Sequence, residues 1–352
     1  MVGCWDPNES TRESFRCAWR EFTLGSGSTL IESHVEELLA LPLAFLADDS
    51  WPRRVQSAAA IADLARVLER AARAQAGGDK AAAALAVLAD RALPELVRAA
   101  QGRVWPGKAQ VLECLVLVCT TAANAKHGAA DMPRVVSELL LREIPRGDLA
   151  YRRSVVTHFC ALVEAVPALD VYAEASAVML DIIAHGMSSA SDVDEEPLHR
   201  PLQLLLIAAA VRALLLALPQ SRVLSEEEAA AAARVLCGVA RDGVWNIRVA
   251  SLECLQALVS SCVEPGRDGL VRALGVPGIL DAIGVCAAEG KYVAVRTAAL
   301  GALEAVLGSL PLIERVVGPL GTVARGILDL LANDPVPSIA DRAKDAKAKS
   351  DR

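Results

Sequence analysis

The chain has 352 residues, of which 53% are hydrophobic, only 3% are aromatic and 22% are charged. Alanine and leucine rank at the top of the intrinsic helix scale and strand-length β-branched runs are scarce, so the composition predicts an all-α protein. The formal net charge of −7 argues against a nucleic-acid binder held by bulk electrostatics, and the length exceeds what one compact core usually serves.

The first 29 residues are expected to form a partly irregular lead-in. The stretch GSGS at Gly25–Ser28 is interpreted as a linker before the first repeat. It is not a phosphate-binding loop because no Lys-Ser/Thr follows, and the chain contains no G-x-S-x-G nucleophile elbow.

From residue 48 onward one motif recurs: an acid, two residues, an aromatic residue and then a base. Four copies are Asp48-Trp51-Arg54, Asp148-Tyr151-Arg152, Asp242-Trp245-Arg248 and Glu289-Tyr292-Arg296; a looser copy has Trp105 and Lys108, with Gly102 in place of the acid. The aromatic residues are separated by 54, 46, 94 and 47 positions. Because 94 is twice 47, one repeat has lost its aromatic residue, and the predicted helix at Pro201–Leu218 fills that gap.

A period near 47 with two helices per unit is typical of HEAT or armadillo-type solenoids, so we expect an α-α superhelix without a β-sheet. The partner helices are expected at Leu30–Ala47, Ala81–Ala100, Met132–Glu143, Val171–His185, Glu226–Arg241, Leu270–Ala288 and Glu314–Ala332. This predicts a solenoid over residues 30–340 with about six and a half repeats, a flexible acidic loop at 186–200, and a charged tail at 341–352 that frays.

The recurring motif carries its own structural expectations. Asp242 is expected to cap the next helix by accepting hydrogen bonds from its first backbone amides. Trp51, Trp105 and Trp245 are expected to be packing residues at the repeat turns, because they recur in register with the apolar stripes. The acid and the base are expected to pair within or across repeats.

The residues that carry chemistry give no catalytic, cofactor or metal site. The histidines His34, His127, His158, His185 and His199 lack zinc-ligand spacing. The nine cysteines contain no CxxC pair and mostly fall on apolar stripes, which favours small packing residues in a reducing compartment. The apolar segment Pro201–Pro219 is close to membrane-spanning length, but Gln203 and Arg212 favour a buried solenoid helix over insertion.

Several stretches resemble one family. DDSWPRRVQSAAAIADLA resembles its S-W-x-x-(K/R)-x-Q-x-A-x-A-I-A helix, and GRVWPGK at Gly102–Lys108 resembles its G-R-x-W-x-G-K segment. CAWREFTLGSGSTL is similar to its lead-in, and VWNIRVASLECLQALV and KYVAVRTAALGALEAVL are similar to its last two aromatic-led helices. The likeness, from about Cys17 to about Leu310, is to the C-terminal HEAT region of the proteasome adapter and scaffold protein family.

The resemblance implies a non-enzymatic scaffold of the cytoplasm and nucleus that binds the 26S proteasome and supports its assembly, stability or recruitment. It implies no cofactor and no small-molecule substrate, and the partner-binding residues stay unknown. Members of that family are several times longer, so this chain corresponds to their C-terminal end. The alternatives are a TOG-type HEAT array that binds tubulin, a transport receptor or another protein-binding solenoid.

Overall fold

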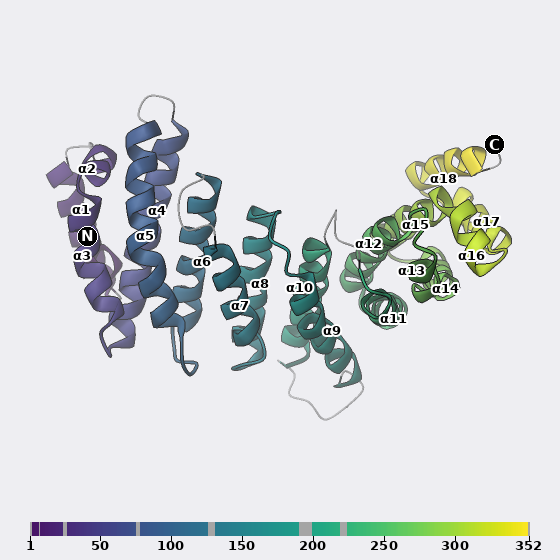
Figure 1. Cartoon of the computed structure of the whole chain (residues 1–352), viewed down its shortest axis with the longest axis horizontal. Coiled ribbons are helices and arrows are strands. Elements are labelled where there is room, and N and C mark those ends of the chain that lie inside the picture. Colours follow the sequence, from purple (N-terminus) through teal and green to yellow (C-terminus); the bar gives the residue numbers. More distant parts are fainter. Residues whose placement is uncertain are drawn as a thin grey trace. The chain divides into compact units, whose positions relative to one another are not determined.

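The computed structural model describes residues 2–6, 8–23, 27–74, 78–125, 131–189, 199–218 and 224–350. Over these ranges the chain forms eighteen α-helices, one short 3-10 helix and no strand (Figure 1). The fold class predicted from composition and period, an all-α repeat solenoid, is confirmed. The chain divides into two compact units, Met1–Leu169 and Asp170–Arg352.

The first unit begins with the 3-10 helix and continues with eight helices that stack as successive pairs. Their bounds are η1 Val2–Trp5, α1 Glu9–Thr23, α2 Gly27–Ser33, α3 Val35–Leu46, α4 Trp51–Arg73, α5 Gly78–Ala100, α6 Lys108–Asn124, α7 Met132–Glu143 and α8 Leu149–Ala165. Helices α4, α6 and α8 contact one another in that order, and α3, α5 and α7 form the second row.

The second unit repeats this two-row arrangement. Its helices are α9 Tyr172–Ser189, α10 His199–Ala217, α11 Glu226–Asp242, α12 Trp245–Cys262, α13 Asp268–Ala273, α14 Val276–Ala287, α15 Val293–Gly308, α16 Leu310–Val317, α17 Gly321–Ala332 and α18 Pro337–Ser350. One row contains α10, α12, α15 and α18, and the other contains α9, α11, α14 and α17. Contacts therefore join neighbouring repeats, as a solenoid requires.

The core consists of the apolar stripes that the sequence shows. On α12, Leu252, Leu255, Leu258 and Cys262 recur at three- and four-residue steps, and all four side chains are fully buried. Burying one leucine contributes about 1.5–3 kcal/mol relative to leaving it exposed. Each stripe faces the helices before and after it, so a repeat is stable only within its stack.

Three predicted helices are broken in the structure. Leu30–Ala47 is divided at His34 between α2 and α3. Leu270–Ala288 becomes α13 and α14 because Gly275 adopts a left-handed conformation (φ +59°) and Pro277 follows at the second position of α14. Glu314–Ala332 becomes α16 and α17, because Gly318 has φ +100° and Pro319 follows it. Each C-terminal repeat therefore has a short extra helix, giving three helices instead of two.

The predicted segment boundaries fall inside helices. Helix α2 crosses position 29, and α18 continues through position 341 to Ser350, with Ile339, Ala340 and Ala343 buried. Pairing of this short apolar stripe with α15 and α17 explains why part of the charged tail is helical. Both ends of the predicted acidic loop at 186–200 are helical, because α9 extends to Ser189 and α10 starts at His199; positions 190–198 lie outside the described residues.

The apolar segment beginning at Pro201 lies in α10, where Leu206, Ile207, Val211 and Leu214 are buried. By length and composition, none of the helices in the described ranges is a membrane span by itself. Helices α15 and α16 meet the test only as a pair, and they are bent by 70° where they join.

A candidate partner-binding edge on a ladder of buried cations

The base of the recurring motif has the same position in the five repeats that carry it. It lies in the first turn of the second helix, and its side chain donates a hydrogen bond to a backbone carbonyl at the end of the first helix or in the turn that follows it. The bonds are Arg54 Nε to Asp48 O (2.5 Å), Lys108 Nζ to Gly102 O (3.0 Å), Arg152 Nε to Ile144 O (3.1 Å), Arg248 Nε to Ala240 O (2.9 Å) and Arg296 Nη1 to Glu289 O (2.9 Å). These bonds satisfy carbonyls that the ends of the first helices leave without partners.

Three of these cations also reach an acid in the following repeat. Lys108 Nζ lies 2.8 Å from Glu143 Oε2, Arg248 Nη1 lies 2.6 Å from Glu289 Oε2, and Arg296 Nε lies 2.6 Å from Asp334 Oδ2. The predicted pairing across repeats is therefore present, and it is more buried than a surface ion pair. We call this series of buried cations and acids the cation ladder.

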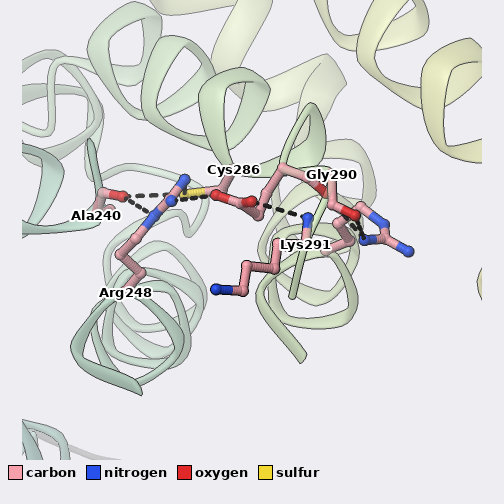
Figure 2. A network of polar contacts seen from close by, with 7 residues as sticks. Ala240, Arg248, Cys286, Gly290 and Lys291 are labelled. Atoms are coloured by element: carbon pink, nitrogen blue, oxygen red, sulfur yellow. Dashed lines mark hydrogen bonds and ion pairs between the residues drawn. The ribbon is translucent and has the colours of Figure 1, made fainter. Parts of the chain in front are cut away.

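Figure 2 shows the ladder of the second unit around Arg248. The guanidinium contacts the Ala240 carbonyl, the Cys286 sulfur at 3.5 Å and the Glu289 carboxylate. Glu289 also accepts a hydrogen bond from the backbone N–H of Lys291 at 3.0 Å. One carboxylate thus fixes both the preceding repeat and the turn that starts α15.

The carboxylates of this ladder have lowered pKa values. The Lys291 N–H and then the Arg248 guanidinium hold the pKa of Glu289 below its usual range, and the hydrogen bonds from Arg296 do the same for Asp334. Because the pKa is lower in the folded chain, each carboxylate stabilises the folded state at pH values above its pKa in the unfolded chain, about 4. This stabilisation is lost as the pH falls through the pKa of the carboxylate in the folded chain.

We therefore expect Asp334→Asn to lower the melting temperature most at neutral pH. Because protonation removes the same charge from the natural side chain, the gap between the two proteins should narrow as the pH falls below about 4. Calorimetry of both proteins between pH 7 and pH 3 measures this difference in melting temperature. A gap that stays constant over this range would contradict a stabilising charge at Asp334.

The prediction that the aromatic residues are packing residues is only partly right. Trp105 is buried at 7% exposure, whereas Trp51 is 42% exposed and Trp245 is 46% exposed. Trp51 stacks on Trp105 with ring centroids 6.3 Å apart, and Trp245 stacks on Tyr292 at 5.7 Å. Stacking on the next repeat covers one ring face, and the other stays exposed because each exposed tryptophan is the first residue of its helix.

Capping by the acid of the motif differs from one repeat to another. Asp148 Oδ1 accepts from the Tyr151 N–H at 2.8 Å and caps α8. Asp242 does not cap α12, so that prediction is wrong: it is the last residue of α11, and the N-cap position of α12 is Val244. Gly243 and Val244 separate Asp242 from the first residue of α12, whereas Asp148 directly precedes α8.

The exposed residues of successive turns form one edge in the second unit. Val244 directly precedes α12, Trp245 is the first residue of α12, and Val293 is the first residue of α15. Each of these side chains is more than two-fifths exposed. Lys291 is exposed beside them, with its Nζ 5.1 Å from the centroid of the Tyr292 ring. This second-unit edge, Val244–Asn246 with Lys291–Val293, offers apolar and aromatic contact area on a backbone that the cation ladder holds still. Such patches mark binding surfaces.

The described ranges contain no group of three or more His, Cys, Asp or Glu side chains arranged to hold a metal ion. His158 is mostly buried, its Nε2 lies 3.1 Å from Ser154 Oγ, and burial lowers its pKa. His127, and the side chain of His199, lie outside the described residues.

All nine cysteines are free thiols, and eight of them are buried. The interpretation of cysteine as a small packing residue holds for these eight, and burial raises the pKa of Cys119 and Cys254 to about 12. Cys17 is the exposed one.

We expect a native chain treated with a maleimide reagent at neutral pH to be modified rapidly at Cys17 alone. The buried thiols should react only after unfolding, because the reagent cannot reach them in the folded chain. Mass spectrometry of timed samples gives the order of labelling. Rapid native labelling of Cys254 or Cys262 would contradict the packing of α12.

The fold and the ladder define the class: an armadillo-type α-helical repeat protein. Residues 127–349 match the family described as ECM29, C-terminal ARM-like repeats, and the chain belongs to that family. It is also 20% identical over 304 residues to the human proteasome adapter and scaffold protein ECM29, an alignment that covers 83% of this chain. The chain spans only 16% of the length of that human protein.

Proposed function

We propose that this chain is a non-enzymatic scaffold segment that binds the 26S proteasome and supports its assembly, stability or recruitment, in the cytoplasm and nucleus. The family match and the name of the human relative support the partner. The observation that carries the proposal is the second-unit edge, where exposed Trp245 and its neighbours lie inside the family-matched region on a rigid base. Large aromatic side chains at such positions dominate protein–protein binding.

The test is co-purification of the tagged chain with intact 26S particles. Trp245→Ala should lower the recovery about tenfold or more, the effect of losing an aromatic anchor. The matched control is Val323→Ala, because Val323 is 53% exposed but lies near the start of α17, at the end away from the turn. Absence of proteasome from the wild-type sample, or equal loss with both variants, would contradict the proposal.

Trp245→Ala should at the same time cost only about 1 kcal/mol of unfolding free energy. The ring keeps one face in solvent, so the loss is mainly its stack on Tyr292. Urea unfolding of both proteins measures it. A cost of 3 kcal/mol or more would mean that Trp245 is a core residue, and the binding result would then need another explanation.

A second candidate function is tubulin binding of the TOG type. In such arrays tryptophan and basic residues of the turns contact acidic tubulin, and here exposed Trp51 lies beside Arg53 and Arg54. Gel filtration of the chain with soluble tubulin distinguishes the two candidates. Only tubulin binding predicts that the chain and tubulin elute in one peak in the absence of proteasomes.

A further inference from the structure

The second-unit edge continues onto a third turn, the one that precedes α18. Helix α18 contacts α15 in the same row, and Trp245, Tyr292 and Pro337 are separated by 47 and 45 positions. These three residues therefore hold equivalent places in successive repeats. Pro335 and Pro337 are exposed, and Val336 between them is half-buried. Apolar side chains of three consecutive repeats thus follow one another at the starts of α12, α15 and α18.

The cation ladder fixes the third turn in the same way as the second. Arg296 Nε lies 2.6 Å from Asp334 Oδ2, Arg296 Nη2 lies 3.2 Å from Asp334 Oδ1, and both side chains are less than one-tenth exposed. Asp334 Oδ1 also accepts a hydrogen bond from the Val336 N–H at 2.8 Å. Glu289 does the same for the N–H of Lys291, which is again two residues further on. The two prolines restrict the backbone further, so this turn loses little conformational freedom when a partner covers it.

The three turns together carry a single charge. Their sequences are Val-Trp-Asn at 244–246, Lys-Tyr-Val at 291–293 and Pro-Val-Pro at 335–337, so Lys291 is the only charged residue among the nine. Lys291 is exposed, and it forms no ion pair with a carboxylate of the described residues. A partner that covers these turns removes water from the ammonium group, and a buried cation without a partner is costly. The complementary surface is therefore apolar, with an acid opposite Lys291.

The size of a stable interface also favours a contact that extends past the first two turns. Such an interface buries about 800 Å² on each side, supplied by about 20–30 residues. The six residues of the second-unit edge supply only part of that area. The third turn continues the same apolar chemistry in the next repeat, and it lies inside the family-matched range 127–349.

We propose that Pro335–Pro337 is a third contact of the surface that binds the 26S proteasome, and that the contacted proteasome surface is apolar with one carboxylate opposite Lys291. This inference rests on the proposed function, because it extends the same edge and names the chemistry of the partner surface. The buried pair of Arg296 and Asp334 holds the third turn in place for that contact.

The test of the third turn is co-purification of tagged full chains with 26S particles. Pro335→Glu should lower the recovery about tenfold or more, because it buries an unpaired charge in an apolar contact. The matched control is Pro311→Glu, which changes another exposed proline beside a helix start. Pro311 lies in α16, beyond the far end of the 16-residue helix α15 and so about 24 Å from the edge. The control should leave the recovery unchanged, and melting curves of both variants show that they are folded.

The acid on the partner is tested by charge reversal. Lys291→Glu should lower the recovery about tenfold or more at low salt, and the difference from the wild-type chain should shrink as the salt concentration rises. Arg272→Glu is the control, because it makes the same change in net charge at an exposed residue of α13, beyond the other end of α12. Equal recovery with the two variants would overturn the acid opposite Lys291.

A second measurement of the third turn does not depend on loss of binding. In a Cys17→Ser background the remaining thiols are buried, so Pro335→Cys can be labelled selectively with benzophenone maleimide. On irradiation of the complex it should crosslink to a proteasome subunit, whereas Pro311→Cys should not.

The outcomes separate this inference from the proposed function. If Trp245→Ala lowers the recovery but Pro335→Glu does not, and labelled Pro335→Cys gives no crosslink, the third contact is overturned and the proposed function stands. If the wild-type chain recovers no proteasome, the proposed function is overturned and this inference with it.

Discussion

Glu143→Ala is expected to destabilise the first unit by about 3–5 kcal/mol, the cost of breaking a buried ion pair from one side. Glu143 is 1% exposed; it pairs with Lys108 and with Arg146, and it accepts a hydrogen bond from the Tyr151 hydroxyl at 2.8 Å. Its removal leaves the fully buried Lys108 ammonium with the Gly102 carbonyl as its remaining hydrogen-bond partner among the described residues.

The control is Glu95→Ala, which breaks the exposed pair between Glu95 and Arg98 on α5 and should cost at most about 1 kcal/mol. The double variant Lys108→Met/Glu143→Gln should recover much of the loss, because it removes the buried charge together with its partner. Hydrogen exchange should show weaker protection around α6–α8 and unchanged protection in the second unit. If the Glu143 and Glu95 variants were equally stable, the buried ion pairs of the cation ladder would not stabilise the fold more than an exposed pair does.

Gly107→Ala is the second large effect, with an expected cost of about 2–5 kcal/mol. Gly107 has φ +100°, where an L side chain is strained by about 1–2 kcal/mol, and an added Cβ would lie 2.3 Å from Val55 Cγ2. Val55 is β-branched and lies in helix α4, so it cannot rotate away freely, and overpacking adds about 1–3 kcal/mol.

Gly102→Ala separates the two contributions. Gly102 has φ +83° but an added Cβ would meet no atom within 4 Å, so this variant should show only the backbone strain. Thermal or urea unfolding of the two variants gives the difference. If the Gly107 variant were no less stable than the Gly102 variant, the close contact between the α6 turn and α4 would be wrong.

The segment Gly102–Lys108 shows what the sequence could and could not predict. The general HEAT repeat pattern does not require these residues, and in the structure most of them have a role in packing. Gly102 and Gly107 adopt left-handed backbone conformations, Trp105 stacks on Trp51, and Lys108 is a buried member of the ladder. Burial of a lysine depends on an acid 35 residues away, which no local pattern reveals.

The period of 47 was sufficient to predict the fold and most second-row partners, including α7 at the predicted residues Met132–Glu143. The breaks at Gly275 and Gly318 follow from backbone conformations, and a Gly-x-Pro or Gly-Pro sequence was the available signal. The exposure of Trp51 and Trp245 could not be predicted, because the same spacing places an aromatic ring at a helix start whether or not its outer face is covered.

The most direct test of the proposed scaffold role is hydrogen exchange of the full chain with and without purified 26S proteasomes. The account predicts added protection at Val244–Asn246 and Lys291–Val293, with little change near Val323 at the other end of the repeat. Protection confined to other surfaces, or none at saturating proteasome, would contradict the assignment of the second-unit edge as the contact surface.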